Sequence, residues 1–361
     1  MTRICFLIDR LTRGGTETQL LALIRALDRS RFAPSLVLLD GTDADSMALV
    51  PTECPVLRLG LTKLHRPTAL AAAAKLVRFW RDERVDLVQA YFLDSVYFGV
   101  PLARVCGVKR IVRVRNNVGH WLTPRHRALG RVMARMVDAT LTNCEPARQA
   151  ILDAERGDAR KVIVLENGVD LTRFESLPTP PRRARTLRVG VVANLRPVKG
   201  IDVFTRAAAL IDNPAVSFAV AGEGEQRPEL ERLIADLGLD NRFRLIGNIA
   251  DVPSFLANLD VVVLPSHAEG MSNAILEAMA AGRPVVATDV GANAHLLGDG
   301  AYGMLVPPGD PAALADAIRR LLVDPVRAQT LGDAGRRHVR ATYSRDAMRR
   351  RFERFYERLC A

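Results

Sequence analysis

Short apolar runs alternate with segments of helical periodicity along most of the chain. Ile4–Ile8 is an apolar run, and in Thr18–Leu27 leucine and isoleucine recur every three or four positions. Strands that are buried on both faces are apolar throughout, because helices cover both sides of a parallel sheet. The alternation therefore predicts an α/β fold of doubly wound parallel sheets. Further strands of the first half are predicted at Ser35–Leu39, Leu87–Ala90, Ile111–Val114, Thr140–Thr142 and Val162–Leu165.

A proline-rich segment at residues 177–185 interrupts this alternation. Three of the four residues from Pro178 to Pro181 are prolines, which continue neither a helix nor a sheet, so the segment is predicted to be a linker. It separates a first Rossmann-like domain (1–176) from a second (186–343). Open parallel sheets bind ligands at the carboxyl ends of their strands, so a cleft between the two domains is expected. Strands of the second domain are predicted at Leu187–Ala193, Val216–Ala221, Phe243–Ile246, Val261–Leu264 and Val285–Ala287.

The last segment, residues 344–361, has the pattern of one amphipathic helix. Its apolar residues fall on a single helical stripe among arginines. The pattern predicts a final helix that buries this stripe against another part of the protein. The residues of the stripe are Met348, Phe352, Phe355, Tyr356 and Leu359.

Composition places the chain among ordinary globular proteins. It has 361 residues, enough for about two domains, and 48% of them are hydrophobic. Its five cysteines are far apart and form no Cys-x-x-Cys pair, which argues against a zinc site or a disulfide framework and fits a reducing cytoplasm. The first apolar run is too short for a signal peptide, and no run of 18 apolar residues occurs. We expect a cytoplasmic protein.

Positive charge is concentrated in the first half of the chain. The formal net charge is +11, and residues 95–137 contain nine basic residues and no acid. Such a block favours an anionic partner, although a solvated basic face without a partner would give the same pattern. Aromatic residues are only 5% and do not alternate with the basic ones, so nucleic-acid binding is not expected.

Two glycine-containing turns follow predicted strands. Gly14, Gly15 and Thr16 open the first helix, where backbone amides favour an anion, although such a turn also needs glycine for local reasons. The segment 222–227 is similar to a dinucleotide fingerprint, but Arg227 stands in place of the third glycine. We interpret it as a turn and expect neither a nicotinamide nor a flavin site.

The loop Asn194–Gly200 places two cations after the first strand of the second domain. Arg196 can hold a phosphate with a fork of donors, and Lys199 can act as a point charge. Both are candidates to bind a diphosphate. A surface loop with two incidental cations would have the same sequence.

The segment 265–287 is the most informative in the chain. A predicted strand ends at Leu264 and a helix begins near Ser272, so Glu269 lies in the loop and Glu277 about one turn into the helix. The amides of Gly270, Met271, Ser272 and Asn273 stand at the helix start, where phosphate is favoured. The two carboxylates can accept hydrogen bonds from the hydroxyls of a sugar or a ribose.

These residues resemble the retaining glycosyltransferases of family 4, which have the GT-B fold. The resemblance rests mainly on Glu269-x7-Glu277 within 265–288, and Asn167-Gly168-Val169-Asp170, Lys199-Gly200 and Gly14-Gly15-Thr16-Glu17 support it. It covers essentially the whole chain. The fold that it implies is two Rossmann-like doubly wound domains with a central cleft and a C-terminal helix that crosses back to the first domain.

The resemblance also implies roles for the candidate residues. Lys199 would neutralise the donor diphosphate, Glu277 would hold the ribose hydroxyls, and Glu269 would contact the donor sugar. The amides of residues 270–273 would line sugar and phosphate, and Gly15 would approach the diphosphate from the first domain. Lys199 and Glu269 are the expected catalytic residues, and no metal and no cofactor beyond a nucleotide-diphosphate sugar as co-substrate is implied.

The chain departs from the family pattern at several positions. Asn194 stands where many members have the diphosphate arginine, and Arg196 is a neighbouring candidate. Arg115 and Asn116 occupy the stretch where members often carry a histidine, and His120 follows a few residues later. These three are candidates for the acceptor side. His295 stands where a glutamate is common.

The expected activity is transfer of a hexose-type sugar, with retention, to a lipid-linked or polysaccharide acceptor in cell-surface glycan biosynthesis. The alternatives are a sugar-nucleotide epimerase on a similar fold and a non-catalytic nucleotide-sugar-binding subunit. A helical stripe flanked by Arg127, Arg131 and Arg135 could attach the protein peripherally to an anionic inner membrane face, although core packing explains the stripe equally well. The residues of this stripe are Leu129, Val132, Met133 and Met136.

Overall fold

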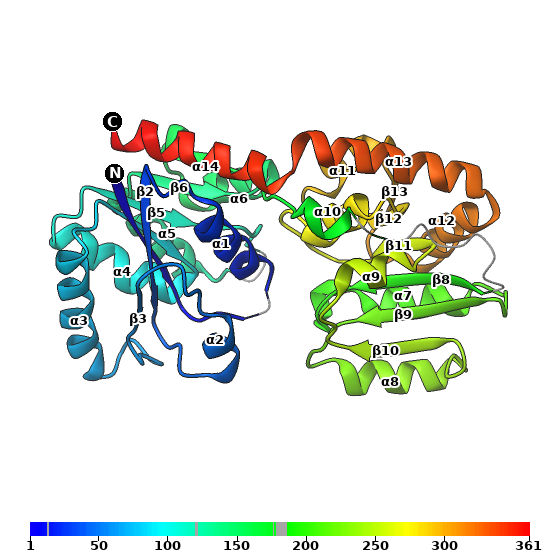
Figure 1. The fold of residues 1–361 in the computed structure, drawn as a ribbon. Coiled ribbons are helices and arrows are strands. Elements are labelled where there is room, and N and C mark those ends of the chain that lie inside the picture. The colour runs from blue at the N-terminus through cyan, green and yellow to red at the C-terminus, as the bar shows by residue number, and fades with distance from the viewer. Residues whose placement is uncertain (13, 120–121, 176, 178–185) are drawn as a thin grey trace. The chain divides into compact units, whose positions relative to one another are not determined.

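A computed structural model describes residues 1–12, 14–119, 122–175, 177 and 186–361, and the chain divides into two compact units (Figure 1). The first unit comprises Met1–Asn167 and Arg345–Ala361, and the second comprises Gly168–Ser344. The second unit thus begins earlier than the expected boundary at residue 176, because Val169 pairs with Ser344 and Phe174 is buried. Apart from Leu177, the expected linker 177–185 lies outside the described residues.

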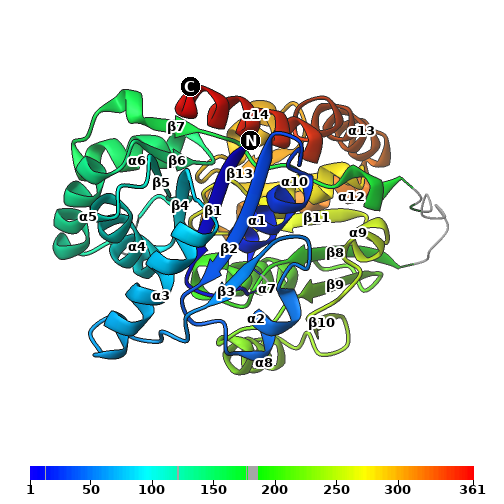
Figure 2. The ribbon, with the colours of Figure 1, turned by 60° about the vertical axis from the view of Figure 1, so that its left-hand side comes forward.

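The first unit is built on a seven-stranded parallel sheet in the order β3-β2-β1-β4-β5-β6-β7 (Figures 1 and 2). Alternate side chains of β1 enter two different cores, Phe6 with α1 and Leu7 with α3, α4 and α5. Burial on both faces explains the uninterrupted apolar run of this strand. The elements are β1 (Thr2–Ile8), α1 (Gly15–Ala26), β2 (Phe32–Leu38), α2 (Ala44–Leu49), β3 (Val56–Arg58), α3 (Thr68–Asp82), β4 (Leu87–Tyr91), α4 (Leu93–Val105), β5 (Arg110–Val114), α5 (Pro124–Met136), β6 (Ala139–Thr142), α6 (Glu145–Glu155), η1 (Ala159–Lys161) and β7 (Val162–Val164).

The final helix, α14 (Arg345–Cys360), also belongs to the first unit (Figure 1). Tyr356 is fully buried, its hydroxyl donates to Oε1 of Gln89 at 3.0 Å, and its ring lies 5.9 Å from that of Phe32. Glu353 accepts a hydrogen bond from the Asp28 amide at 3.0 Å. The apolar stripe seen in the sequence is therefore core of the first unit.

The second unit repeats this architecture on a six-stranded parallel sheet in the order β10-β9-β8-β11-β12-β13. Its core includes the packed rings of Phe204, Phe218 and Phe243. The elements are η2 (Leu171–Phe174), β8 (Leu187–Val192), η3 (Pro197–Lys199), α7 (Ile201–Ala209), β9 (Val216–Ala221), α8 (Arg227–Asp236), β10 (Phe243–Gly247), α9 (Val252–Ala257), β11 (Val261–Leu264), α10 (Asn273–Ala280), β12 (Val285–Thr288), α11 (Asn293–Leu296), η4 (Gly298–Gly300), β13 (Met304–Val306), α12 (Pro311–Val323) and α13 (Pro325–Thr342).

The strand order reverses once in each sheet. The reversal lies between β1 and β4 in the first unit and between β8 and β11 in the second. Loops that leave two such strands diverge to opposite faces of the sheet, which opens a crevice at the carboxyl ends of the strands. Each unit therefore has one place where its topology favours a ligand.

Candidate functional site

In the second unit, Lys199 and Glu269 meet at the point where the strand order reverses. Lys199 ends the short turn η3 after β8, and Glu269 lies in the loop after β11. Lys199 Nζ lies 2.7 Å from Glu269 Oε1, and the Ser266 hydroxyl donates to the same oxygen at 2.7 Å. The structure thus brings together the two residues that were expected to be catalytic.

A close backbone approach holds the two loops together. Gly200 has a φ of +62°, and a Cβ atom there would lie 2.1 Å from the carbonyl oxygen of Pro265. The His267 amide donates to the Val198 carbonyl at 2.8 Å. Only glycine combines this φ with this contact, so Gly200 fixes the backbone that presents Lys199.

A third loop, after β12, supports the start of α10. Gly291 has a φ of +56°, and a Cβ atom there would lie 2.2 Å from the carbonyl oxygen of Glu269. The Ala292 amide donates to the Gly270 carbonyl at 2.9 Å, and the Ser272 side chain accepts from the amide of residue 275 as the N-cap of α10. The backbone of the segment 269–272 is therefore held from both sides.

The other expected donor-side residues of the second unit lie nearby on η3 and α10, whereas Gly15 begins α1 of the first unit. Glu277 is half-buried on α10, and its burial raises the pKa of the carboxyl, while the positive charge of Arg173 opposes this shift. Arg196 is exposed as the N-cap of η3. The donor-side candidates of this unit therefore lie in the η3 turn, in the loop after β11 and on α10.

The segment 222–227 is a turn, as expected. Cβ atoms at Gly222 and Gly224 would lie 2.0 Å and 2.3 Å from the carbonyl oxygens of Ala193 and Leu195. Arg227 forms ion pairs with residues 223 and 231. The glycines are needed to pack this turn against the loop 193–195, which explains their presence without a dinucleotide.

His295, which had no expected role, lies in α11 of the second unit. Its Nε2 is 3.2 Å from the hydroxyl of Tyr343, a residue that is almost fully buried. The contact connects α11 to the end of α13. The histidine therefore contributes to packing within the second unit.

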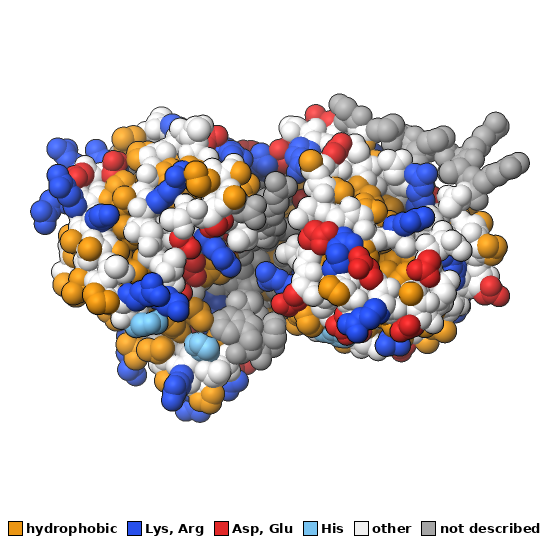
Figure 3. Space-filling view, turned by 90° about the horizontal axis from the view of Figure 1, so that it is seen from below, with side chains coloured by type: hydrophobic (Ala, Val, Ile, Leu, Met, Phe, Trp, Pro, Cys, Tyr) orange, Lys and Arg blue, Asp and Glu red, His pale blue; other side chains and the backbone are white. Residues whose placement is uncertain are grey.

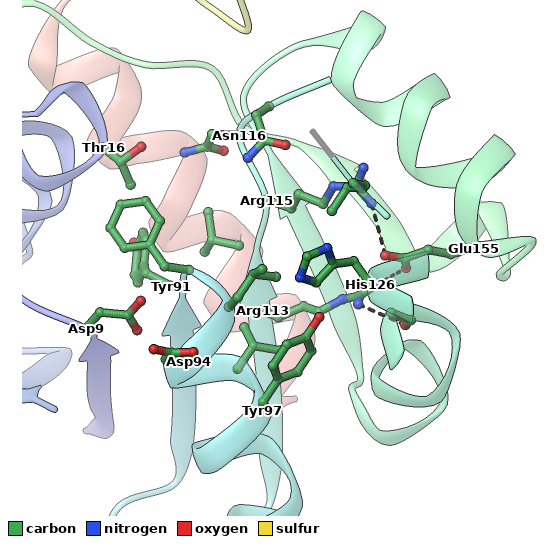
Figure 4. Close-up of a pocket in the computed structure, with 17 residues that line it drawn as sticks. Asp9, Thr16, Tyr91, Asp94, Tyr97, Arg113, Arg115, Asn116, His126 and Glu155 are labelled. Atoms are coloured by element: carbon green, nitrogen blue, oxygen red, sulfur yellow. Dashed lines mark hydrogen bonds and ion pairs between the residues drawn. The ribbon is translucent and has the colours of Figure 1, made fainter. Parts of the chain in front are cut away.

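In the first unit, a cavity of about 450 Å³ lies at the carboxyl ends of β1, β4 and β5 (Figure 4). Asp9, Phe92 and Arg115 enter it from the loops that follow these strands. Arg115 and Asn116, expected on the acceptor side, both line it, whereas His120 lies outside the described residues. Helices α1, α5 and α6 contribute Thr16, His126 and Glu155.

A buried ion-pair network forms one side of this cavity (Figure 4). Arg113 Nη2 pairs with Glu155 Oε2, and Arg115 Nη1 lies 3.0 Å from Glu155 Oε1. Arg113 also donates to Thr140 Oγ1 at 2.9 Å and to the Gly130 carbonyl at 3.1 Å. One carboxylate serves two guanidinium groups, so the network carries a net positive charge. Burial lowers the pKa of Arg115, and the charge of Glu155 opposes this shift.

Gly130, in the middle of α5, is explained by this network. A Cβ atom there would lie 2.7 Å from Glu155 Oε1. Glycine inside a helix is unfavourable relative to alanine by about 1 kcal/mol, so its presence needs a reason. The reason is the close approach of the buried carboxylate.

The opposite side of the cavity is acidic. Asp9 Oδ1 accepts from the Ser95 amide at 2.7 Å and from the Ser95 hydroxyl at 2.5 Å. Burial raises the pKa of the Asp9 carboxyl to about 6, although these hydrogen bonds act in the opposite direction. Figure 4 shows the carboxylate of Asp94 beside that of Asp9.

Three polar atoms of the cavity residues are buried without a hydrogen-bond partner in the described part of the chain. They are Arg115 Nε, Tyr97 Oη and Asn117 Oδ1. A buried polar atom without a partner is unfavourable by about 1–3 kcal/mol. A polar ligand that hydrogen-bonds to them would remove this cost.

Of the residues that line this cavity, only Arg115 and Asn116 were candidates from the sequence. Asp9 directly follows β1 and Phe92 directly follows β4, so their positions at strand ends were a usable signal. His126 and Glu155 come from helices and have no such signal. Only the fold reveals that Glu155 faces arginines about 40 positions earlier in the sequence.

The basic block 95–137 does not form one free surface. Arg113 and Arg115 are paired inside the cavity wall, Lys109 is paired with Asp86, and Arg104 donates to the Met136 carbonyl. Figure 3 shows basic side chains scattered over the face of the first unit that it presents.

The stripe on α5 divides between core and surface. Met133 is buried and Met136 packs against the core, whereas Leu129 and Val132 are 45% and 46% exposed. Core packing therefore accounts for only half of the stripe. Among the helices of the described residues, none has the length and apolar character that crossing a bilayer requires.

Comparison with known proteins identifies the family. The family model described as glycosyl transferase 4-like domain matches residues 14–168, and the one described as glycosyl transferases group 1 matches residues 186–324. The D-inositol 3-phosphate glycosyltransferase of Geodermatophilus obscurus is 35% identical over 322 residues, which cover 78% of this chain and 69% of the relative. The 2-deoxystreptamine glucosyltransferase of Streptomyces kanamyceticus is 29% identical over 326 residues, which cover 81% of this chain and 84% of the relative.

A solved structure shows the same fold. The structure of Anabaena HepE in complex with UDP and glucose matches with a TM-score of 0.88 at 24% identity, over 99% of this chain and all of the other. The expected GT-B architecture of two Rossmann-like units is thereby confirmed. Two family models, a relative at 35% identity and the shared fold together show that the chain belongs to the glycosyltransferases of family 4.

Proposed function

We propose that this protein transfers a hexose-type sugar from a nucleotide-diphosphate sugar to an acceptor hydroxyl, with retention of the anomeric configuration. The observation that carries the proposal is the contact of Lys199 with Glu269 where the strand order of the second sheet reverses. This position favours a nucleotide, and the pair offers a cation for phosphate and a carboxylate for sugar hydroxyls.

The positive charge of Lys199 is available to a donor diphosphate. Its side chain remains 28% exposed, whereas that of Glu269 is 9% exposed. When a diphosphate binds, Lys199 would stabilise the charge that develops as the bond between the sugar and the phosphate oxygen breaks. The amides at the start of α10 would add to this effect. Because Lys199 and these amides supply the charge stabilisation, we propose that the reaction needs no metal ion and no further cofactor.

Retention requires that the acceptor hydroxyl attacks the same face of the sugar that the diphosphate leaves. In the proposed step the new bond joins the acceptor oxygen to the anomeric carbon, and the acceptor proton passes to an oxygen of the leaving diphosphate. No protein nucleophile is needed, so catalysis rests on positioning and on charge stabilisation. The product should keep the anomeric configuration of the donor, which NMR of the product measures.

The donor is best sought first among uridine diphosphate sugars, since solved HepE complexes contain UDP or UDP-glucose. Thermal-shift measurements with the uridine, guanosine and adenosine diphosphates and their glucose derivatives test this choice. Lys199→Ala and Glu277→Ala should each abolish most of the stabilisation by the donor. Glu229→Ala is the matched control, because Glu229 is an exposed helical acid of the same unit. Full stabilisation of all three variants would contradict the assigned donor site.

Turnover distinguishes the transferase from its alternatives. Release of nucleoside diphosphate only in the presence of an acceptor supports transfer. Sugar interconversion without an acceptor would indicate an epimerase, and tight donor binding without release of diphosphate across an acceptor panel would indicate a binding subunit. Activity that persists in EDTA supports the absence of a metal requirement, and its loss would contradict it.

We propose a lipid-linked or polysaccharide acceptor, used in cell-surface glycan synthesis at the cytoplasmic membrane face. The support is the exposed pair Leu129 and Val132 on a helix rich in arginine. Vesicles of phosphatidylcholine with phosphatidylglycerol should bind the protein better than phosphatidylcholine alone. The double variant Leu129→Gln/Val132→Gln should bind less than Val323→Gln, which removes an exposed valine of the second unit. Equal binding to both vesicle types would remove the electrostatic part of the proposal.

A further inference from the structure

The backbone of Phe92 has a conformation that is rare for any residue except glycine. Phe92 stands between the last residue of β4 and the first residue of α4, with φ +61° and ψ 174°. A side chain in this region of backbone conformation is strained by about 1–3 kcal/mol, and such strain is concentrated at functional sites. Glycine at this position would avoid the strain, so the presence of phenylalanine needs a reason other than stability of the fold.

The ring is also unusually accessible. Phe92 lines the cavity of the first unit and is 38% exposed, whereas Tyr91 and Val96, which line the same cavity, are 4% and 5% exposed. Among the exposed large hydrophobic residues in the described part of the chain, Phe92 is the only aromatic one. An apolar surface is therefore presented to whatever the cavity binds.

The groups around this ring are hydrogen-bonding groups. Thr16, Asn116 and the two carboxylates of Asp9 and Asp94 line the same cavity. A pyranose or cyclitol ring has a C–H face that stacks on an aromatic ring and a rim of hydroxyls that donate to carboxylates and amides. The cavity of about 450 Å³ lies at the small end of the usual range for ligand sites, roughly 300–1,000 Å³, which suits a single ring.

We propose that Phe92 is the stacking platform for a saturated, polyhydroxylated six-membered ring of the acceptor, a pyranose or a cyclitol. This rests on the proposed function, because it assigns the cavity of the first unit to the acceptor. The strained turn after β4 holds the phenyl ring in the cavity, and the carboxylates of Asp9 and Asp94 accept from hydroxyls on the rim of the bound ring. Phe92 thereby determines which acceptors bind.

The test separates the ring of Phe92 from its backbone. Phe92→Ala removes the ring and keeps the strain, Phe92→Gly removes both, and Phe92→Trp keeps an aromatic face. Arg84→Gly is the matched control, since Arg84 also has a positive φ, of 49°. It precedes β4 and so lies at the amino-terminal end of that strand, whereas the cavity lies at the carboxyl end. Saturation-transfer NMR measures binding of methyl α-D-glucopyranoside, methyl α-D-mannopyranoside, myo-inositol and 2-deoxystreptamine to the full-length chain.

The expected result is that at least one of these probes binds to the wild type and to Phe92→Trp. Phe92→Ala and Phe92→Gly should bind it about 5- to 10-fold more weakly, as loss of one stacking contact predicts. Phe92→Gly should nevertheless unfold at a higher temperature than Phe92→Ala, against the usual preference for alanine. Arg84→Gly should bind like the wild type.

Three outcomes would overturn the proposal. They are the absence of binding of all four probes to the wild type, unchanged affinity of the alanine and glycine variants, and loss of affinity in Phe92→Ala that Phe92→Gly restores. The last would assign the effect to the backbone. Titration of the same samples with uridine, guanosine and adenosine diphosphates keeps this proposal separate from the proposed function. If a nucleoside diphosphate binds while probe binding fails, only the role of Phe92 is rejected. If the wild type binds neither a probe nor any of the three diphosphates, the proposed function is rejected as well.

Discussion

The buried carboxylate of Glu155 should dominate the stability of the first unit. Its side chain is 4% exposed, and the two guanidinium groups that it pairs, those of Arg113 and Arg115, are 6% and 13% exposed. Glu155→Gln keeps the shape of the side chain but leaves two buried positive charges without a counter-charge. Breaking a buried ion pair from one side destabilises a protein by about 3–5 kcal/mol.

This free energy translates into a large shift of the unfolding temperature. The first unit has roughly 180 residues, a size at which 1 kcal/mol shifts Tm by about 2–4 °C. Glu155→Gln should therefore lower the Tm of this unit by about 6–20 °C. Removing one guanidinium as well, in Arg113→Met/Glu155→Gln, should recover part of the loss, because fewer buried charges then lack a partner.

Tryptophan fluorescence follows the first unit alone, since both tryptophans of the chain fall within residues 1–167. Trp80 belongs to α3 and is 4% exposed in the core of the first unit, so its emission should change on unfolding. Asp153→Asn, which neutralises an exposed acid on the same helix as Glu155, is the control. A Glu155→Gln variant that melts within 2 °C of this control would refute the inference that Glu155 supplies an essential counter-charge to the two arginines.

Three further changes test single features. Asp9→Asn should leave stability nearly unchanged near pH 4 and raise it by up to about 3 kcal/mol at pH 7, as urea unfolding at the two pH values measures. The reason is that the pKa of the Asp9 carboxyl is about 6 in the folded protein, above the usual value of an aspartate, so the stability associated with Asp9 is lost as pH rises from 4 through 6. A flat difference between pH 4 and 7 would contradict this. Gly130→Ala should lower Tm despite the helix propensity of alanine, because the new methyl group would displace the Glu155 carboxylate; a higher Tm would show that the carboxylate moves freely. Gly200→Ala should weaken nucleotide binding and lower the Tm of the second unit by calorimetry, since its Cβ would collide with the Pro265 carbonyl, and unchanged values for both would reject the loop contact.

The strand pattern of the sequence was sufficient for most of the fold. The expected runs at Val216–Ala221 and Val261–Leu264 coincide with β9 and β11. The strands that were not expected, β3 and β13, have three residues each and lie at sheet edges, where neither length nor burial gives a clear pattern. Edge position and shortness alone do not explain the omissions, because β7 also has three residues at a sheet edge and was expected as Val162–Leu165.

The candidate sites differ in how much the sequence reveals. Local motifs singled out Lys199 and Glu269 separately, and the structure adds that they stand at the ends of two neighbouring strands and are in contact. The cavity of the first unit depends instead on helices that return from distant parts of the chain. Glu155 at the end of α6 has the sequence pattern of a surface acid, and only tertiary packing buries it.

The crossing of α14 back to the first unit has a consequence for biosynthesis. The second unit, 168–344, is one uninterrupted stretch that precedes α14 in the chain, whereas the core of the first unit includes Tyr356 of α14 and its contacts include Glu353. The first unit can therefore complete its core only after the whole second unit has been synthesised. A truncation that removes α14 should spare nucleotide binding by the second unit and destabilise the first unit.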